Sequence, residues 1–544
     1  GQGGLGVIGG GVYLNTGGRL AHGGPTDAVA LIEGYRGVVF SGAVERLANY
    51  GTIAGQGVHY AGVYMAEYGV LTNGDSSHTE ALIQGGRGLD LDAGGSVTNF
   101  GAIEGLAGIG VLMGAGGSLT NGGNEDRSAL IHGQVGVDIR SGIGTITNAG
   151  TIEGAGAYSF GAEIYGGGRL TNGSVNNAMA TISGRSGVRL AGGVLATNFG
   201  VIAGLGDAYG AGAYLSGGAL TNGSAGHAGA LVEGYNGVVA SGGATVTNFG
   251  TIEGAEGVAV RFADAADVLV VEAGCAFVGQ VLGGGGTLDL DTGTGKLTGL
   301  LVGGTVTVAG SMAATTFQDF DTVEIGKAAS FATSGAVTLT AARSVIVAGS
   351  LTLGAAKAAV ANAGMIETLG GTITVKGAVT GAGQAIVDGG LIDFTASFNQ
   401  RVAFAGTTGT LELARSQTYT ATISGFSKHG GTLLDLDDIA FGKATTASYS
   451  GTKTSGVLTV TDGTHTAKIN LKGNYLNSTF VAASDGHGGT LVHDPAKATA
   501  APSPHPLIAA MSRLGAGGAG AIEGRAEVWR PPSTMLAKPA AMAA

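Results

Sequence analysis

The feature that most constrains this chain is a short motif, Thr or Ala followed by Asn, which recurs nine times in its first half. Successive asparagines are 24, 26, 22, 27, 24, 26, 24 and 26 residues apart, so two slightly different units alternate in a super-repeat of about 50 residues. A repeat of this length without a helix-forming segment is typical of a solenoid, in which each repeat packs on its neighbours. The repeated asparagines are Asn49, Asn73, Asn99, Asn121, Asn148, Asn172, Asn198, Asn222 and Asn248.

Between successive asparagines the sequence follows one template: Ile-x-Gly, then Gly-Val-x-Leu, then Gly-Gly-x-Leu-Thr-Asn. Each piece alternates apolar and polar positions over only two to four residues, which indicates a short strand with one buried face. Three such strands in about 25 residues are enough for one turn of a parallel β-helix. The repeats therefore predict an all-β chain folded as a parallel β-helix, or β-solenoid, with about 25 residues per coil.

Glycine and asparagine fit the corners of such a coil. Gly accounts for 109 of the 544 residues, and it adopts the positive φ angles of tight corners without strain, with Asn next best. An Asn at the same corner of every coil would lie about 4.8 Å from the next, so that the side-chain amides could form a hydrogen-bonded ladder. We interpret the nine asparagines as this structural ladder; a repeated ligand-binding motif is the alternative.

Composition excludes several classes of protein. The formal net charge is −11, which argues against nucleic-acid binding because neutralising phosphates requires a basic surface. No stretch approaches the 18 or so consecutive apolar residues of a membrane-spanning helix. The single cysteine, Cys275, excludes an internal disulfide. Charged residues are only 12% and hydrophobic residues 44%, which favours a long core of small side chains rather than disorder.

The repeat pattern divides the chain into four parts. Regular coils are predicted for 1–260, and solenoid with more variable coils for 261–425. Residues 426–494 carry hairpin signals such as Asp-Gly turns and predict a β-rich cap, which a solenoid needs at its open edge. Seven of the eight prolines fall after residue 494, so 495–544 is predicted to be a Pro/Ala-rich tail or arm.

Some of these motifs are shared with known proteins. The template Thr-Asn-x-Gly-Thr-Ile-x-Gly, with the segment 283–291 after it, resembles the passenger regions of bacterial autotransporter and haemagglutinin-type adhesins. The stretches 471–475 and 484–490 resemble the C-terminal segment of large secreted repeat proteins of alphaproteobacteria. The resemblance covers most of residues 1–494 and implies a secreted bacterial protein, located outside the cell or on its surface.

Candidate catalytic residues are few. Three Asp-x-Asp pairs would each place two carboxylates on one face of a strand. We expect no catalysis from them, because each pair lies in a different region and none has a nearby basic partner that recurs on adjacent coils. Two close Asp/His groupings stand out, Asp485 with His487 and His493 with Asp494, and we interpret them as turn residues. The three pairs are Asp90 with Asp92, Asp289 with Asp291, and Asp435 with Asp437.

We expect no cofactor. Acidic, glycine-rich turns can bind calcium, but the strict nonapeptide Gly-Gly-x-Gly-x-Asp repeat of calcium-binding β-helices is absent. Residues 285–289 match only a fragment of it. Calcium therefore remains a minor alternative.

The sequence thus predicts an extracellular structural or adhesive protein and not an enzyme. The expected partners are further copies of the chain, meeting head to tail or side by side, and a cell-surface glycan or polysaccharide. Head-to-tail contacts between identical subunits generate filaments, and the tail could dock on a neighbouring subunit. The alternative is a β-helix protein that binds or degrades polysaccharide.

Overall fold

The computed structural model describes residues 11–24, 29–43, 45–123 and 127–495. These residues form a parallel β-solenoid of about 17 turns, with roughly 24 residues per turn and almost no helix. The predicted fold class is therefore confirmed. The predicted tail lies, apart from Pro495, outside the described residues.

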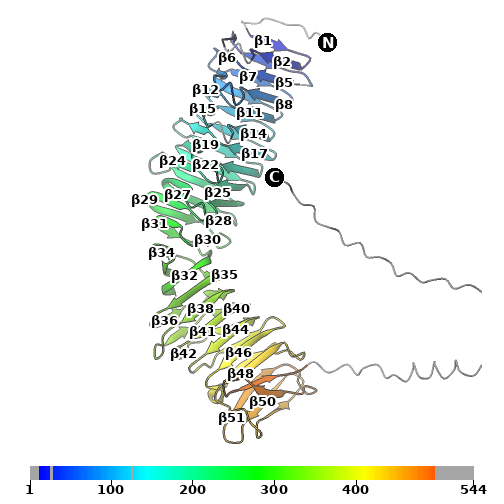
Figure 1. Ribbon diagram of the computed structural model, residues 1–544, viewed down its shortest axis with the longest axis vertical. Helices are drawn as coiled ribbons and strands as arrows, with labels where there is room; N and C mark the ends of the chain where they lie inside the picture. Colours follow the sequence, from blue (N-terminus) through cyan, green and yellow to red (C-terminus); the bar gives the residue numbers. More distant parts are fainter. Residues whose placement is uncertain (1–10, 25–28, 44, 124–126, 496–544) are drawn as a thin grey trace, which may run out of the picture. The chain divides into compact units, whose positions relative to one another are not determined.

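Each regular coil contributes one strand to each of three parallel sheets, and each strand pairs with its counterpart one coil further on (Figure 1). The first sheet consists of β2 (Gly18–His22), β5 (Glu45–Asn49), β8 (Gly69–Asn73), β11 (Gly95–Asn99), β14 (Gly117–Asn121), β17 (Gly144–Asn148), β20 (Gly168–Asn172), β23 (Leu195–Asn198), β26 (Ala219–Asn222), β28 (Thr245–Asn248) and β30 (Val268–Val271). The second consists of β3 (Leu31–Gly34), β6 (Thr52–Gly55), β9 (Leu82–Gly85), β12 (Ala102–Gly105), β15 (Leu130–Gly133), β18 (Thr151–Gly154), β21 (Thr181–Gly184) and β24 (Val201–Gly204). The third consists of β1 (Val12–Leu14), β4 (Val38–Phe40), β7 (Ala61–Met65), β10 (Arg87–Leu91), β13 (Val111–Met113), β16 (Val137–Ile139), β19 (Phe160–Ile164), β22 (Ser186–Ala191) and β25 (Ala211–Ser216). The long strands β27 (Leu231–Ser241) and β29 (Thr251–Phe262) run through both the second and the third sheet.

Glycines allow the coil to turn between the second and third sheets. A Cβ added to Gly85 would collide with the backbone nitrogen of Gly62 one coil away. After the first sheet, Gly74 has a φ of 73°, a left-handed conformation that glycine adopts freely. The short strands and the frequent glycines thus have one cause, because each coil must turn three times in about 24 residues.

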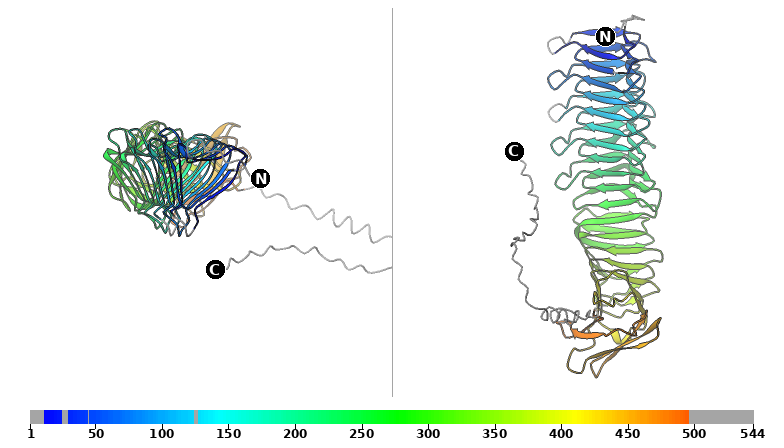
Figure 2. Two further views of the ribbon diagram at one scale, coloured as in Figure 1. Left: turned by 90° about the horizontal axis from the view of Figure 1, so that it is seen from above. Right: turned by 90° about the vertical axis from the view of Figure 1, so that its right-hand side faces the viewer.

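Stacked aliphatic side chains form the core of the regular coils. Ile53 pairs in register with Ile83, which pairs with Ile103, and equivalent residues continue this column along the second sheet. These side chains are fully buried, and burial of each contributes about 1.5–3 kcal/mol to folding. Figure 2 shows the strands of successive coils directly one above another.

An antiparallel insertion follows the regular coils. β31 (Ala276–Leu282) pairs with β34 (Thr315–Gln318), and β33 (Thr305–Gly310) lies antiparallel between β34 and β32 (Thr287–Val302). The buried rings of Phe262, Phe317 and Phe320 pack edge to face at this point, with centroid distances of 6.3–6.4 Å. Large aromatic side chains therefore fill the core where the coil changes shape.

Parallel stacking then resumes from β35 (Thr322–Thr333). One series of strands is β37 (Ser344–Val347), β40 (Met365–Leu369), β43 (Gln384–Asp388), β45 (Arg401–Phe404) and β47 (Thr422–Ser424). A second series is β38 (Ser350–Leu353), β41 (Thr372–Val375), β44 (Leu391–Phe394), β46 (Gly409–Leu413) and β48 (Thr432–Leu436). A small third sheet contains β36 (Val337–Leu339), β39 (Val360–Asn362) and β42 (Val379–Thr380), and a short 3-10 helix spans Ser416–Thr418.

Antiparallel strands end the described part of the chain. β49 (Thr446–Gly451), β50 (Ser455–Thr461) and β51 (Thr466–Lys472) form a meander that pairs with β47, and β52 (Val481–Ser484) with β53 (Thr490–His493) forms a hairpin that pairs with β48. The last strand of the first series, β47, is thus paired in parallel by β51 of the meander, and the last strand of the second series, β48, is paired antiparallel by β53.

Among the described residues, no helix is both long enough and apolar enough to span a membrane.

Candidate functional site

The nine repeated asparagines form one continuous column of hydrogen bonds along the first sheet. They pair in register from coil to coil, and the Nδ2 atom of each donates to the Oδ1 atom of the next at 2.7–3.0 Å. Every member of the column is at most 1% exposed. Buried amides joined in this way stabilise the stack, because each polar group has a partner.

Little bonding capacity in this column is left for a ligand. Asn49 illustrates the pattern: its Nδ2 also donates to the carbonyl oxygens of Gly51 and Leu82, at 2.9 and 3.2 Å, and its Oδ1 accepts the Gly51 N–H. An amide offers two donors and one acceptor oxygen, and all are used here. The geometry of the column is that of a structural ladder.

Both ends of the ladder differ from its middle. At the N-terminal end His22 pairs in register with Asn49, and His22 Nε2 lies 3.2 Å from the carbonyl oxygens of Ala30 and Thr52. His22 therefore occupies the position of a further rung, and Leu20-Ala21-His22-Gly23 is the motif variant that would have revealed it in the sequence. At the other end Asn248 pairs with Val271, after which the column continues with Leu290, Ile325 and Val347.

The first Asp-x-Asp pair lies at the end of β10, in the third sheet. Asp90 is 6% exposed and lies 2.6 Å from Arg87 Nη1. Burial raises the pKa of Asp90, and the Arg87 guanidinium partly opposes that rise. Asp92 accepts a 2.6 Å hydrogen bond from the Tyr64 hydroxyl, which raises the pKa of Tyr64 to about 12.

Arg87 is a basic partner of Asp90 within the same coil, but the pair does not recur on the next coil, where Leu112 stands in register with Asp90. Similar acid–base pairs follow along the third sheet: Arg140 with Asp138 at 3.0 Å, and Arg189 with Glu163 at 3.6 Å. Sequence spacing did not reveal these pairs because Arg87 and Arg140 lie three and two residues from their partners, whereas Arg189 lies one coil away from Glu163. Paired in this way, the carboxylates link neighbouring parts of the surface.

The other two pairs lie far from the first along the chain. Asp289, on β32, is in register with Glu324 on β35, and burial together with that neighbouring charge raises the pKa of Asp289 to about 6. Asp435, on β48, belongs to a row in which Asp393, Glu412 and Asp435 lie directly opposite one another on adjacent strands. The structure therefore leaves the three pairs in separate coils.

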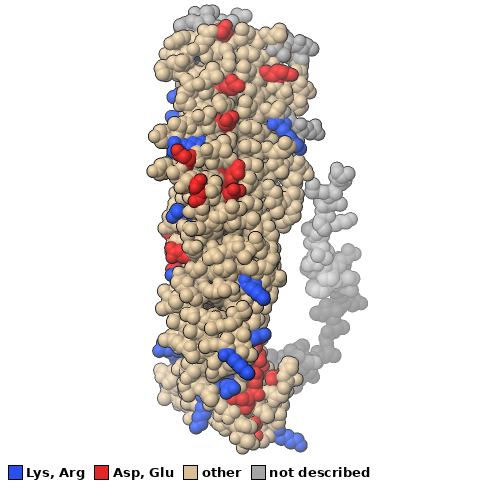
Figure 3. Space-filling view, turned by 90° about the vertical axis from the view of Figure 1, so that its left-hand side faces the viewer, with Lys and Arg blue, Asp and Glu red and all other residues tan. Residues whose placement is uncertain are grey.

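The row on β44, β46 and β48 consists of like charges. Burial, followed by repulsion from neighbouring carboxylates, raises the pKa of Asp393 to about 6, of Glu412 to about 7 and of Asp435 to about 6. Figure 3 shows one face that is mostly uncharged, with separate acidic side chains over its N-terminal half and a group of them near its C-terminal end. Burial and like-charge repulsion thus favour the protonated form of all three groups.

Asp435, Asp437 and Asp485 could each direct one oxygen toward a cation, since these atoms lie within 4.8 Å of one another. Calcium takes 6–8 oxygen ligands at 2.3–2.6 Å. Asp485 also accepts backbone N–H bonds from His487 and the two glycines after it at 2.7–3.0 Å, the turn role expected for this segment. With one oxygen from each carboxylate, the cluster supplies three of these ligands.

A further surface was missed by the sequence analysis. Tyr158 and Tyr209, 87% and 76% exposed, project from two loops that lie two coils apart on either side of Arg185. Arg185 joins these loops, because Nη1 donates to the Ala157 carbonyl at 2.6 Å and Nη2 lies 2.8 Å from Asp207.

Arginines and aromatic rings alternate on this surface, around a cavity of about 340 Å³. The guanidinium of Arg185 lies 5.3 Å from the ring centre of Tyr158, and that of Arg189 lies 4.8 Å from the ring centre of Phe160. Phe160 packs edge to face on Tyr214. The sequence signal was a loop ending in Tyr that recurs one super-repeat later. We call these six residues the tyrosine–arginine surface: Tyr158, Phe160, Arg185, Arg189, Tyr209 and Tyr214.

Comparison with known proteins found no match to this chain among family models, curated proteins or solved structures.

Proposed function

We propose that this protein is an extracellular structural and adhesive β-solenoid, which acts through the exposed faces of its stacked coils. The observation that carries the proposal is the tyrosine–arginine surface. Tyr and Arg are enriched at the energetic centres of protein interfaces, and two tyrosines exposed by more than three quarters would gain by being covered. The ladder, on the first sheet of the same coils, supports this role because it stabilises the stack that carries the surface.

Assembly is proposed to be side by side. Continuing the parallel stack from one copy to the next would require free strand edges at both ends. At the C-terminal end β47 and β48 already pair with β51 and β53, which disfavours head-to-tail growth by backbone pairing. A lateral contact through the tyrosine–arginine surface needs no free edge.

Negative-stain microscopy of the purified protein at increasing concentration tests this proposal. We expect side-by-side bundles that grow with concentration and that disappear in the double variant Tyr158→Ser, Tyr209→Ser. Tyr68→Ser is the matched control, since Tyr68 is 57% exposed and lies outside the surface; it should leave the bundles unchanged. A parent protein that stays monodisperse at every concentration would contradict the proposal.

Polysaccharide binding is the second candidate, and one feature of the second half of the chain favours it. That feature is a long polar groove, lined by residues at the start of β37, β40, β43, β45 and β47. No catalytic role is proposed for the three Asp-x-Asp pairs, because they lie in separate coils.

A further inference from the structure

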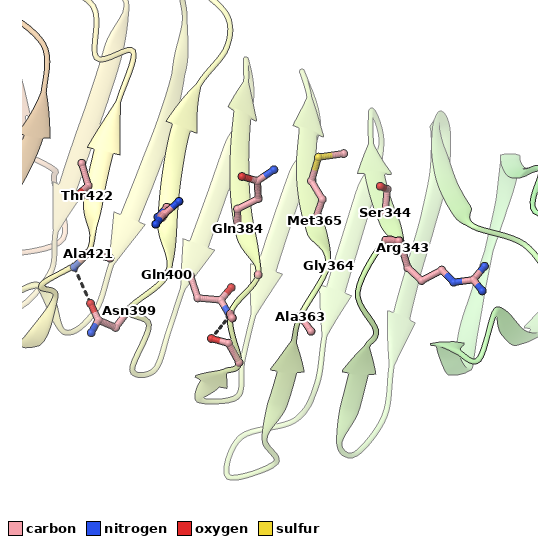
Figure 4. A pocket seen from close by; sticks show the side chains of 15 residues that line it. Arg343, Ser344, Ala363, Gly364, Met365, Gln384, Asn399, Gln400, Ala421 and Thr422 are labelled. Atoms are coloured by element: carbon pink, nitrogen blue, oxygen red, sulfur yellow. Dashed lines mark hydrogen bonds between the residues drawn. The ribbon is translucent and has the colours of Figure 1, made fainter.

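A groove of about 680 Å³ crosses five coils in the second half of the chain (Figure 4). It follows the corner at which β37, β40, β43, β45 and β47 begin. One outward-facing residue from each strand lines it, and these residues succeed one another in register from coil to coil. They are Ser344, Met365, Gln384, Arg401 and Thr422.

Small residues create the hollow beside this row. Ala363, Gly364, Gly381, Ala382 and Gly383 line it and extend no long side chain into it. Two of the glycines are required by close approach, since a Cβ on Gly364 would collide with the Arg343 carbonyl oxygen and one on Gly383 with the Gly364 carbonyl oxygen. The hollow is therefore a consequence of how the coils pack.

Hydrogen bonds beneath the groove hold its shape. Asn362 Nδ2 donates to Gln400 Oε1 at 2.7 Å, and Gln400 Nε2 donates back to the Asn362 carbonyl at 2.7 Å and to the Gly381 carbonyl at 3.0 Å. The Tyr419 hydroxyl donates to the Gln400 carbonyl at 2.9 Å. Asn362 and Gln400 are at most 5% exposed, so a ligand would meet a preformed surface.

The charge of the groove is opposite to that of the protein. Among the residues that the structure describes, its lining contains Arg343 and Arg401 and no carboxylate, although the whole chain carries a formal charge of −11. Arg343 is engaged by Asp321 and by the Phe320 carbonyl. Within the described part of the chain, the exposed side chains of Arg401 and Gln384 have no hydrogen-bond or ion-pair partner, so both are available to a ligand.

We infer that this groove binds a linear acidic polysaccharide whose chain lies along the stack; the inference deepens the proposed adhesive function. A free guanidinium recognises a carboxylate through two parallel hydrogen bonds. Gln384, Ser344 and Thr422 supply the donors and acceptors that sugar hydroxyls need. Four inter-strand spacings give the row a length of about 19 Å, which accommodates an extended polymer rather than a single small molecule.

Two other polymers fit the groove less well. No aromatic ring from the described part of the chain lines it, so the bases of a single-stranded nucleic acid would lack an aromatic side chain to stack on. An extended peptide would add to a free strand edge, but β40, β43 and β45 already pair with a strand on each side.

Binding of polygalacturonate to the full chain, followed by biolayer interferometry, tests this inference. The matched neutral probe is the same polymer with its carboxylates methyl-esterified. We expect Arg401→Gln to weaken polygalacturonate binding about tenfold or more, as loss of a charge-assisted bond would, and Ala382→Trp to abolish it by filling the groove. Arg169→Gln, at another exposed arginine, should change nothing.

Three results would overturn the inference: equal affinity of the parent for the esterified polymer, equal affinity of Arg401→Gln and the parent, or equally tight binding of single-stranded DNA. Two variants distinguish polysaccharide binding in the groove from side-by-side assembly through the tyrosine–arginine surface. Tyr158→Ser with Tyr209→Ser should keep polygalacturonate binding while losing the bundles, and Ala382→Trp should do the reverse.

Discussion

The Nδ2 atom of Asn148 lies 2.8 Å from the Oδ1 atom of Asn172, and both side chains are at most 1% exposed. Asn121 makes the same contact with Asn148 from the preceding coil, at 2.9 Å. Each amide is therefore donor to one neighbour and acceptor from the other. Removal of the Asn148 amide takes the donor away from Asn172 Oδ1 and from the Gly150 and Thr181 carbonyl oxygens. Asn121 Nδ2 loses one acceptor but keeps the Ala129 and Thr151 carbonyls.

Asn148→Ala should lower the stability of the central coils by about 1–3 kcal/mol, the usual cost of leaving buried donors or acceptors unsatisfied. Hydrogen–deuterium exchange is the appropriate measurement, because a solenoid can open locally without unfolding as a whole. Faster exchange is expected in β14, β17 and β20. Thr147→Ala is the control, since Thr147 is the exposed neighbour on the same strand; a similar effect from both variants would contradict the role of the ladder.

His22, at the N-terminal end of the ladder, allows a test in which a substitution should increase local stability. His22 is 8% exposed and approaches two backbone carbonyls, as the asparagines do. His22→Asn should slow exchange in β2 and β5, because an Asn at this position could also donate to Asn49 Oδ1. His22→Ala should accelerate it, with a loss of about 1 kcal/mol. Identical exchange in the two variants would show that position 22 is not part of the ladder.

The sequence was sufficient to predict the solenoid, because the positions that define it repeat. Ile-x-Gly and Thr-Asn recur at the coil period, so strand direction, register and the column of Asn49 to Asn248 followed from counting. His22 escaped because a single histidine does not match the repeated residue. The apolar column after Val271 has no motif at all and appears only through its pairing.

The surfaces could not be predicted in the same way. Arg185 contacts loops from the coils before and after its own, and the groove depends on Ala and Gly residues that leave space at one corner. Such features depend on how loops of variable length fold over a regular stack. The residues of these two surfaces come together in space without any regular spacing in the sequence.

The acidic row of Asp393, Glu412 and Asp435 should make the end of the stack more stable in acid. Burial raises the pKa values of these groups to about 6, about 7 and about 6, so each binds its proton more tightly in the folded chain than in the unfolded one. Stability from this source is complete below about pH 4, the ordinary carboxyl pKa, and is lost as the pH rises through 6 and 7.

Exchange in β44, β46 and β48 at pH 5 and pH 8, corrected for the intrinsic pH dependence of exchange, measures this effect. Glu412→Gln should reduce the difference between the two pH values, because it removes the central charge of the row. Glu104→Gln, on β12 in the second sheet, is the control and should leave that difference unchanged. Stronger protection of β44, β46 and β48 at pH 8 than at pH 5 would contradict the prediction.

The stability of the antiparallel insertion should depend strongly on its aromatic core, so that truncation of one ring there costs more than truncation of one aliphatic side chain in a regular coil. Phe317 is fully buried and packs edge to face on Phe277 and Phe320, with centroid distances of 5.7 and 6.3 Å. Phe317→Ala should cost about 3–5 kcal/mol, and limited proteolysis should then cleave between β31 and β35. Phe317→Leu, which keeps most of the volume, should cost less than about 1.5 kcal/mol.

Ile143→Ala is the control, because it removes a side chain that is 74% exposed and should leave the digestion pattern unchanged. Cleavage elsewhere in Phe317→Ala, with the insertion still resistant, would show that the insertion does not rely on this ring.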